Sequence, residues 1–177
     1  MELRADATLA FPRARVFTTY RDHLVEVAEH LPNIRGIKPI RREDRPGEVE
    51  LVTEWIGGGD IPKVARAFLS EAMLKWTDHA TWKEEGFVTE WRTEVRVFPG
   101  ALLSSGKNSF VETAGGGTRI EFRGELTCDA SKVPGVPRFV ARTINGTIEK
   151  LFVSTIAANL VAVGRAVGKL LEKEGPS

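Results

Sequence analysis

Cysteine is nearly absent from this sequence, because Cys128 is the only one among 177 residues. A single thiol excludes an intramolecular disulfide and any zinc site that needs several cysteines. Histidine is also scarce, and His23, His30 and His79 show neither the His-x-x-x-His nor the Glu-x-x-His spacing of common metal sites. We therefore predict no metal site and interpret all three histidines as surface residues.

Motifs for nucleophilic catalysis and for phosphate binding are missing as well. No Gly-x-Ser-x-Gly elbow occurs, and Cys128 falls at the end of a predicted strand. The glycine runs at 57–59 and 115–117 lack the Lys-Ser/Thr pair of a phosphate loop, so we interpret them as turns. The sequence thus predicts no catalytic residue and no cofactor.

Neither sign of charge is in excess, since 25 Lys and Arg residues balance 24 Asp and Glu residues. This balance removes the usual electrostatic argument for nucleic acid or an anionic membrane surface, and we expect no nucleic-acid partner. The basic residues between Arg35 and Arg45 are interrupted by Glu43 and Asp44. A solvated sheet edge explains this stretch better than an anionic partner does.

Long hydrophobic runs are absent too. The most apolar stretch, 151–167, contains Ser154, Thr155, Asn159 and Arg165, so we interpret it as a buried helix and expect no integral membrane segment. The N-terminus alternates charged and apolar residues, unlike a secretory signal, which makes a cytoplasmic location the expectation. With 42% hydrophobic residues, the chain is expected to form one domain, residues 1–177, around a substantial core.

What the sequence does have is clear periodicity. Alternation of apolar and polar residues predicts half-buried strands over 3–11, 34–42, 48–56, 74–82, 87–97, 102–112 and 119–128. The facing of 102–112 stays unassigned, because Gly106, Lys107 and Asn108 interrupt its pattern. Apolar residues three or four apart predict helices over 13–30, 62–73 and 138–173, the first broken near Arg21 and Asp22.

This order of elements indicates an α+β fold in which a curved antiparallel sheet wraps around the long C-terminal helix. Each strand has one apolar face that needs a cover, and 138–173 is the only predicted element long and apolar enough to supply it. The sheet and helix would then enclose one interior. Left dry, an apolar cavity of about 300 Å³ would cost about 7 kcal/mol, so we expect water or a ligand there.

Three stretches resemble the START-like superfamily, also called SRPBCC. They are the opening strand with Phe-Pro-Arg-Ala-Arg-Val-Phe at 11–17, Leu-Pro-Asn-Ile at 31–34, and Gly-Thr-Arg-Ile-Glu-Phe at 117–122 before the long helix. The segment at Ile61 and Pro62, with Trp76 and Trp82, looks like uncharacterised members of that superfamily. The resemblance covers nearly the whole chain and implies the helix-grip fold with a ligand cavity. It implies no single chemistry, because the superfamily includes lipid carriers, plant-hormone binders and aromatic polyketide cyclases.

The candidate pocket residues lie on the predicted inward faces. Indoles fill cores and also line apolar pockets, so both roles stay open for the tryptophans. Asp78 shares a face with Trp76; either burial raises the pKa of its carboxyl, or a bulge turns it into water. The second interpretation is preferred, because unpaired buried charges are rare. The side chains expected to bind a ligand are Trp55, Trp76, Asp78, Trp82, Trp91, Thr93, Phe122, Ile148, Phe152 and Ile156.

Three functions follow from these expectations. The leading one is non-catalytic binding or carriage of a hydrophobic small molecule, lipid-like or aromatic, in an internal cavity. The second is a cyclase or dehydratase acting on a polyketide-like substrate, with Asp78 as general acid or base. The third is an interaction module with a solidly packed interior, which the size of the cavity would distinguish from the other two.

Overall fold

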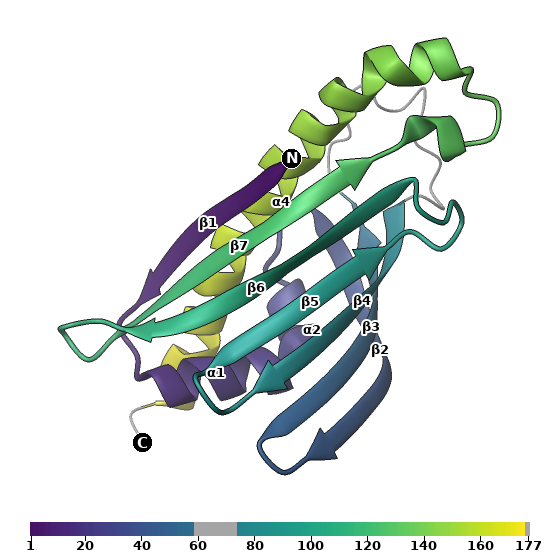
Figure 1. Ribbon diagram of the computed structural model, residues 1–177. Helices are drawn as coiled ribbons and strands as arrows, with labels where there is room; N and C mark the ends of the chain where they lie inside the picture. The colour runs from purple at the N-terminus through teal and green to yellow at the C-terminus, as the bar shows by residue number, and fades with distance from the viewer. Residues whose placement is uncertain (59–73, 176–177) are drawn as a thin grey trace.

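The computed structural model describes residues 1–58 and 74–175, and at 144, 148 and 151 it describes the backbone alone. Within these residues one antiparallel seven-stranded sheet has the order β1-β7-β6-β5-β4-β3-β2 (Figure 1). The strands are β1 (Glu2–Leu9), β2 (Ile34–Arg45), β3 (Glu48–Gly57), β4 (Lys75–Lys83), β5 (Val88–Glu94), β6 (Leu102–Glu112) and β7 (Thr118–Cys128). The helices are α1 (Arg13–Asp22), α2 (Leu24–Ala28), the 3-10 helix η2 (Ala130–Lys132) and α4 (Arg138–Glu174). The helix predicted over 62–73 lies outside the described residues.

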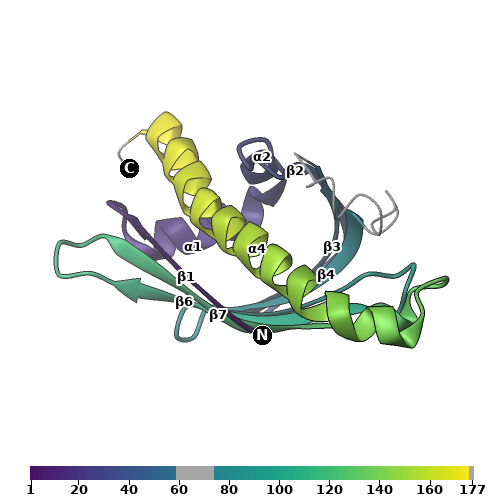
Figure 2. The ribbon, with the colours of Figure 1, turned by 90° about the horizontal axis from the view of Figure 1, so that it is seen from above.

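The sheet is curved, and α4 lies diagonally across its concave side (Figure 2). The helix packs against β1 and β7 and against the two short helices α1 and α2. A long helix held in a curved antiparallel sheet is the α+β helix-grip architecture expected from the order of the elements.

The C-terminal half of α4 is anchored in the core. Val163, Val167 and Leu171 are buried there, and the core continues into an aromatic cluster around Phe17 on α1. The Phe17 ring meets the rings of Trp82, Phe87 and Phe110 edge-on, at centroid distances between 5.1 and 5.4 Å. Edge-to-face pairs of this kind add to the stability that burial of the rings provides.

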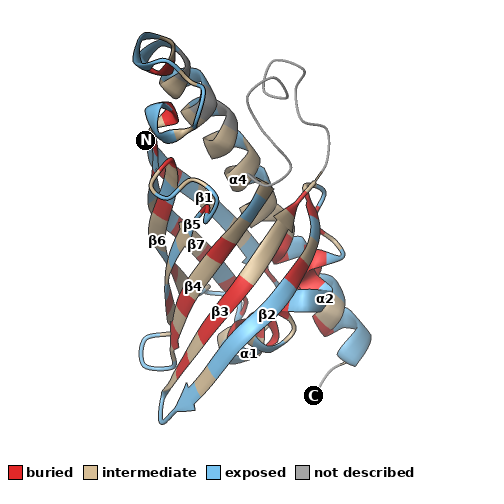
Figure 3. Ribbon diagram, turned by 90° about the vertical axis from the view of Figure 1, so that its right-hand side faces the viewer, coloured by how far each residue is buried: buried red, intermediate tan, exposed pale blue. Residues whose placement is uncertain are grey.

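The N-terminal half of α4 is much less covered. Phe139 is 75% exposed, and Phe152 and Ile156 are only half-buried. Figure 3 shows buried residues along the strands and on α2, whereas the upper part of α4 is mostly intermediate. The helix therefore leaves part of the concave face without a closely packed cover.

Residues 145–174 of α4 are long and apolar enough, by length and composition, to cross a membrane. The core helix of a globular domain meets the same criterion. Here Gly164 brings the helix close to β1, since a Cβ at this position would lie 2.5 Å from the Cβ of Ala7. The face of α4 around Gly164 thus packs against the sheet.

Local sequence explains most of the boundaries. Pro12 precedes the first residue of α1, where helices tolerate its fixed backbone angle. The predicted break in the 13–30 helix is confirmed at His23, between α1 and α2. The predicted solvated edge is confirmed too: β2 is an edge strand, and its Arg41 and Arg45 form ion pairs with Glu43 and Glu50.

Two details of the strand predictions are wrong. The first hairpin continues to Arg45, so its turn contains only Pro46 and Gly47, with Gly47 at a φ of +74°. The strand predicted over 87–97 is too long, because β5 ends at Glu94 and the chain turns before β6, which leaves Val97 49% exposed. The structure also assigns the facing of β6, whose buried residues Ser104, Asn108 and Phe110 lie on its concave side.

Candidate ligand-binding site

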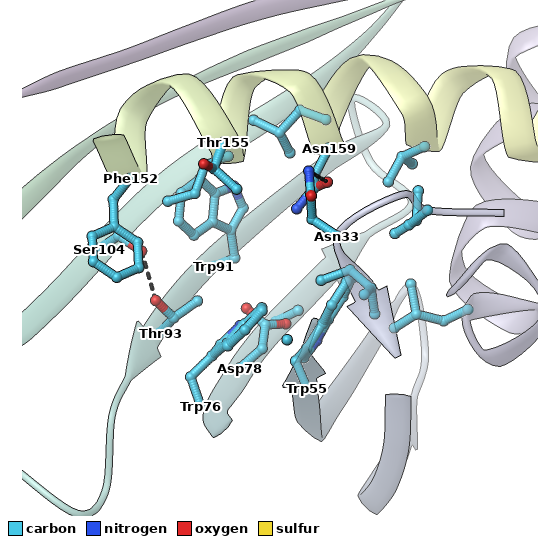
Figure 4. Close-up of a pocket in the computed structure, with 18 of the residues that line it drawn as sticks. Asn33, Trp55, Trp76, Asp78, Trp91, Thr93, Ser104, Phe152, Thr155 and Asn159 are labelled. Carbon is cyan, nitrogen blue, oxygen red and sulfur yellow. Dashed lines mark hydrogen bonds between the residues drawn. The ribbon is translucent and has the colours of Figure 1, made fainter. Parts of the chain in front are cut away.

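A pocket of about 240 Å³ lies between the concave face of the sheet and the poorly covered part of α4 (Figure 4). Strands β3 to β6 contribute most of its sheet side, and Phe152, Thr155, Ile156 and Asn159 line it from α4. Inward faces of antiparallel strands place every second side chain toward this space. The pocket is therefore a direct result of the curvature of the sheet and of where α4 rests on it.

All four tryptophans of the chain line the pocket. Trp55 and Trp76 face each other across β3 and β4, and their rings stack with centroids 5.9 Å apart and 16° between planes. Trp82 is buried against Tyr20, whose ring meets it edge-on at 5.1 Å. The indoles thus give the pocket an extended aromatic wall.

Trp91 is held in a fixed position by its surroundings. Its Nε1–H donates to Oδ1 of Asn108 at 2.8 Å, across the β5–β6 pair. Behind the indole lie Gly106 and Gly124, where an added Cβ would come within 2.5 Å and 3.1 Å of the ring. The glycine that interrupts the pattern of 102–112 is thus the residue that makes room for this indole.

A polar strip accompanies the aromatic wall. The hydroxyls of Thr93 and Ser104 lie 2.6 Å apart, joining β5 to β6 (Figure 4). On the opposite side of the pocket, the Nδ2 of Asn33 donates to Oδ1 of Asn159 at 3.2 Å, which ties the start of β2 to α4. Thr89, another lining residue, has a buried hydroxyl without a hydrogen-bond partner among the described residues.

Asp78 faces the pocket. The register of β4 is unbroken, with Asp78 opposite Thr53 of β3 and opposite Thr93 of β5. The preferred sequence interpretation, a bulge that turns Asp78 into water, is therefore wrong, and its half-buried side chain is one of the lining residues. Burial raises the pKa of this carboxyl to about 7, so near neutral pH the side chain is not the fixed charge that made burial look unfavourable.

Tyr20 is the other titratable side chain of the lining. Burial, with a further contribution from the nearby Asp78 carboxylate, raises the pKa of its phenol, which stays protonated. No lysine, arginine or histidine lines the pocket within the described part of the chain. Nor do three His, Cys, Asp or Glu side chains gather there as a metal site would require, in the residues 1–58 and 74–175.

The structure brings most of the predicted site residues together. The pocket lining includes Trp55, Trp76, Asp78, Trp82, Trp91, Thr93, Phe152 and Ile156. Phe122 does not line it, because its ring is 1% exposed and lies within the packed core. The side chain of Ile148 lies outside the described residues.

Several lining residues were not predicted. Counting back by twos from Phe110 passes through Asn108 and Ser104, so their facing is available from the alternation that begins at the C-terminal end of β6. Asn33 and Asn159 offer no such signal, because 126 positions separate them and only folding brings them together.

Comparison with solved structures supports the same architecture. No family model and no curated protein matches the sequence. TTHA0849 from Thermus thermophilus is similar at 17% identity and a TM-score of 0.69, covering 96% of this chain and 99% of that one. The ZhuI aromatase/cyclase from a Streptomyces species is similar at 14% identity and a TM-score of 0.70, covering 100% of this chain and 99% of that one. Ara h 8.0201 is similar at 14% identity and a TM-score of 0.53, covering 98% of each chain. The chain therefore has the same helix-grip fold as these proteins, which is the fold that the sequence resemblance implied.

Proposed function

We propose that the protein binds or carries a hydrophobic small molecule, lipid-like or aromatic, in the pocket between the sheet and α4. The observation that carries this proposal is the volume of about 240 Å³ lined by all four tryptophans. Left dry, a cavity of this size would cost about 6 kcal/mol by the slope measured for core truncations. That is comparable with the stability of a whole domain, about 5–15 kcal/mol, so the pocket is expected to hold water or a ligand.

The interaction-module alternative loses its premise, because it required an interior filled by side chains. The cyclase or dehydratase alternative keeps one specific observation in its favour. A carboxyl whose pKa is about 7 is suited to exchange protons near neutral pH, and Asp78 points it into the pocket. Turnover of a polyketide-like substrate that disappears in Asp78→Asn, with folding intact, would favour the enzyme over the carrier.

Binding can be tested with a pair of matched substitutions on α4. Thr155 lines the pocket, whereas Thr147 is exposed on the same helix and does not. Thr155→Phe is expected to weaken binding of a ligand by about tenfold or more, because a loss of about 1.4 kcal/mol of buried contact suffices for that factor. Thr147→Phe should leave the affinity unchanged.

The tryptophans provide the readout, since all of them line the pocket and a bound molecule alters their fluorescence. Candidates come from native mass spectrometry and solvent extraction of the purified protein, followed by lipid and polyketide libraries. A protein that carries nothing, and that gives neither a thermal shift nor a fluorescence change with these libraries, would refute the proposal.

A further inference from the structure

The ionisable side chains in the described lining of the pocket are acidic, and none is basic. Among the described lining residues Asp78 and Tyr20 are the only titratable ones, and no cationic side chain accompanies them. A ligand carboxylate or phosphate would therefore enter a low-dielectric space that already holds a carboxyl and in which the described side chains offer no counter-charge. The charge pattern of the lining disfavours anionic amphiphiles such as free fatty acids.

The carboxyl of Asp78 has no partner in the part of the chain that the structure describes, and burial is the only cause of its raised pKa. Its two cross-strand neighbours are Thr53 and Thr93, and neither hydroxyl is hydrogen-bonded to it. Thr53 accepts the Nε1–H of Trp55 at 3.0 Å, and Thr93 pairs with Ser104 at 2.6 Å. Since none of the residues 1–58 and 74–175 takes up the oxygens of Asp78, these oxygens are available to a molecule inside the pocket.

Two indoles lie next to this carboxyl. Asp78 and Trp76 are two residues apart on the inward face of β4, and Trp76 stacks on Trp55 of β3; all three line the pocket (Figure 4). The negative face of an indole attracts a cation, and this attraction is stronger when water is excluded. A carboxylate without a partner among the described residues and the indole faces near it are both complementary to a positive charge.

We propose that the ligand of this pocket carries a protonated amine, which pairs with Asp78 and lies against Trp55 and Trp76. This inference rests on the proposed binding function and narrows it to a cationic, largely apolar or aromatic ligand class. The remaining pocket wall takes the apolar body of the ligand, and Asp78 sets its orientation. In the competing arrangement a neutral Asp78 donates a hydrogen bond to a ligand carbonyl. The affinity for the ligand would then change with pH in the opposite direction.

Titration separates the two arrangements. The titratable group that faces Asp78 from the elements around the pocket is Tyr20 of α1; the described lining residues of β3, β5, β6, β7 and α4 add none. An aliphatic amine stays protonated to about pH 9, so below that pH only Asp78 changes its charge. With its pKa at about 7, the ionised fraction, and with it amine affinity, rises about tenfold from pH 6 to pH 8. The affinity for a carbonyl ligand would instead decrease as the pH rises from 6 to 8.

The experiment uses three probes that share one ring: 1-naphthylmethylamine, 1-naphthalenemethanol and 1-naphthoic acid, measured by calorimetry on the intact chain. At pH 8 the amine is expected to bind about 10-fold to 100-fold more tightly than the alcohol, as a charge-assisted pair in a buried site implies. The acid should bind most weakly. Asp78→Asn is expected to remove the advantage of the amine and leave the alcohol nearly unchanged.

Asp6→Asn is the matched control, since Asp6 pairs with Arg123 on β7 and does not line the pocket. It should leave the order of the three probes unaltered. An amine that binds no better than the alcohol, or an amine affinity that does not rise between pH 6 and pH 8 in the unmodified protein, overturns this inference alone. If none of the three probes binds, the inference fails together with the proposed function.

Discussion

Asp78 lowers the stability of the empty protein above neutral pH, and replacing it with asparagine should remove that effect. The ordinary pKa of the group is 3.8 and burial raises it to about 7. A carboxyl with a raised pKa holds its proton in the folded state at pH values where the unfolded chain has lost it. The free energy of unfolding therefore decreases as pH rises from about 4 to about 7, and the full cost is present above that range.

The size of the effect follows from the shift. A difference of about three pH units, at about 1.4 kcal/mol per unit, corresponds to about 4 kcal/mol in total. About 2.5 kcal/mol of this accumulates between pH 5 and pH 8. The asparagine in the Asp78→Asn variant would not titrate, so whatever its amide costs in the pocket is the same at both pH values.

The assay is urea unfolding of the protein and of Asp78→Asn at pH 5 and at pH 8, without ligand. The stability of the variant relative to the parent should increase by about 2.5 kcal/mol between the two pH values. Asp6→Asn should show no comparable change, because Asp6 is exposed on the outer face of β1. A difference between parent and Asp78→Asn that is the same at pH 5 and pH 8 would refute the burial of this carboxyl.

Two further predictions concern packing around the pocket. Gly164→Ala should destabilise the protein by about 1–3 kcal/mol, because its Cβ would lie 2.5 Å from that of Ala7. Gly146→Ala, exposed on the same helix with nothing within 4 Å, should stabilise it by about 0.5–1 kcal/mol; equal effects in thermal unfolding would contradict the close approach of α4 to β1. Burial, with the nearby Glu149 and Asp129, raises the pKa of the Cys128 thiol to about 11, so iodoacetamide at pH 8 should label it slowly in the folded protein and readily in denaturant. Rapid labelling of the folded protein would show that the end of β7 is open.

Local pattern determines much of this protein. Alternation alone places Trp76, Ala80 and Trp82 on one inward face, because the side-chain period of a strand is a property of its own backbone. The helical period likewise predicts α4 and the 13–30 helix, whose break was predicted near Arg21 and Asp22 and lies at His23. The overall α+β arrangement follows from these elements, since the apolar strand faces require one long apolar cover.

The tertiary structure decides which side chains line the pocket. Whether Asp78 meets water or indoles depends on the register of β4 with both neighbours, and no local pattern fixes that pairing. The position of α4 is set by its close approach to β1 at Gly164. One side of the pocket is formed by Asn33 and Asn159, which are 126 positions apart in the sequence. Periodicity acts over a few residues and assigns faces, whereas the size and chemistry of the pocket arise from distances between segments that only the folded chain brings together.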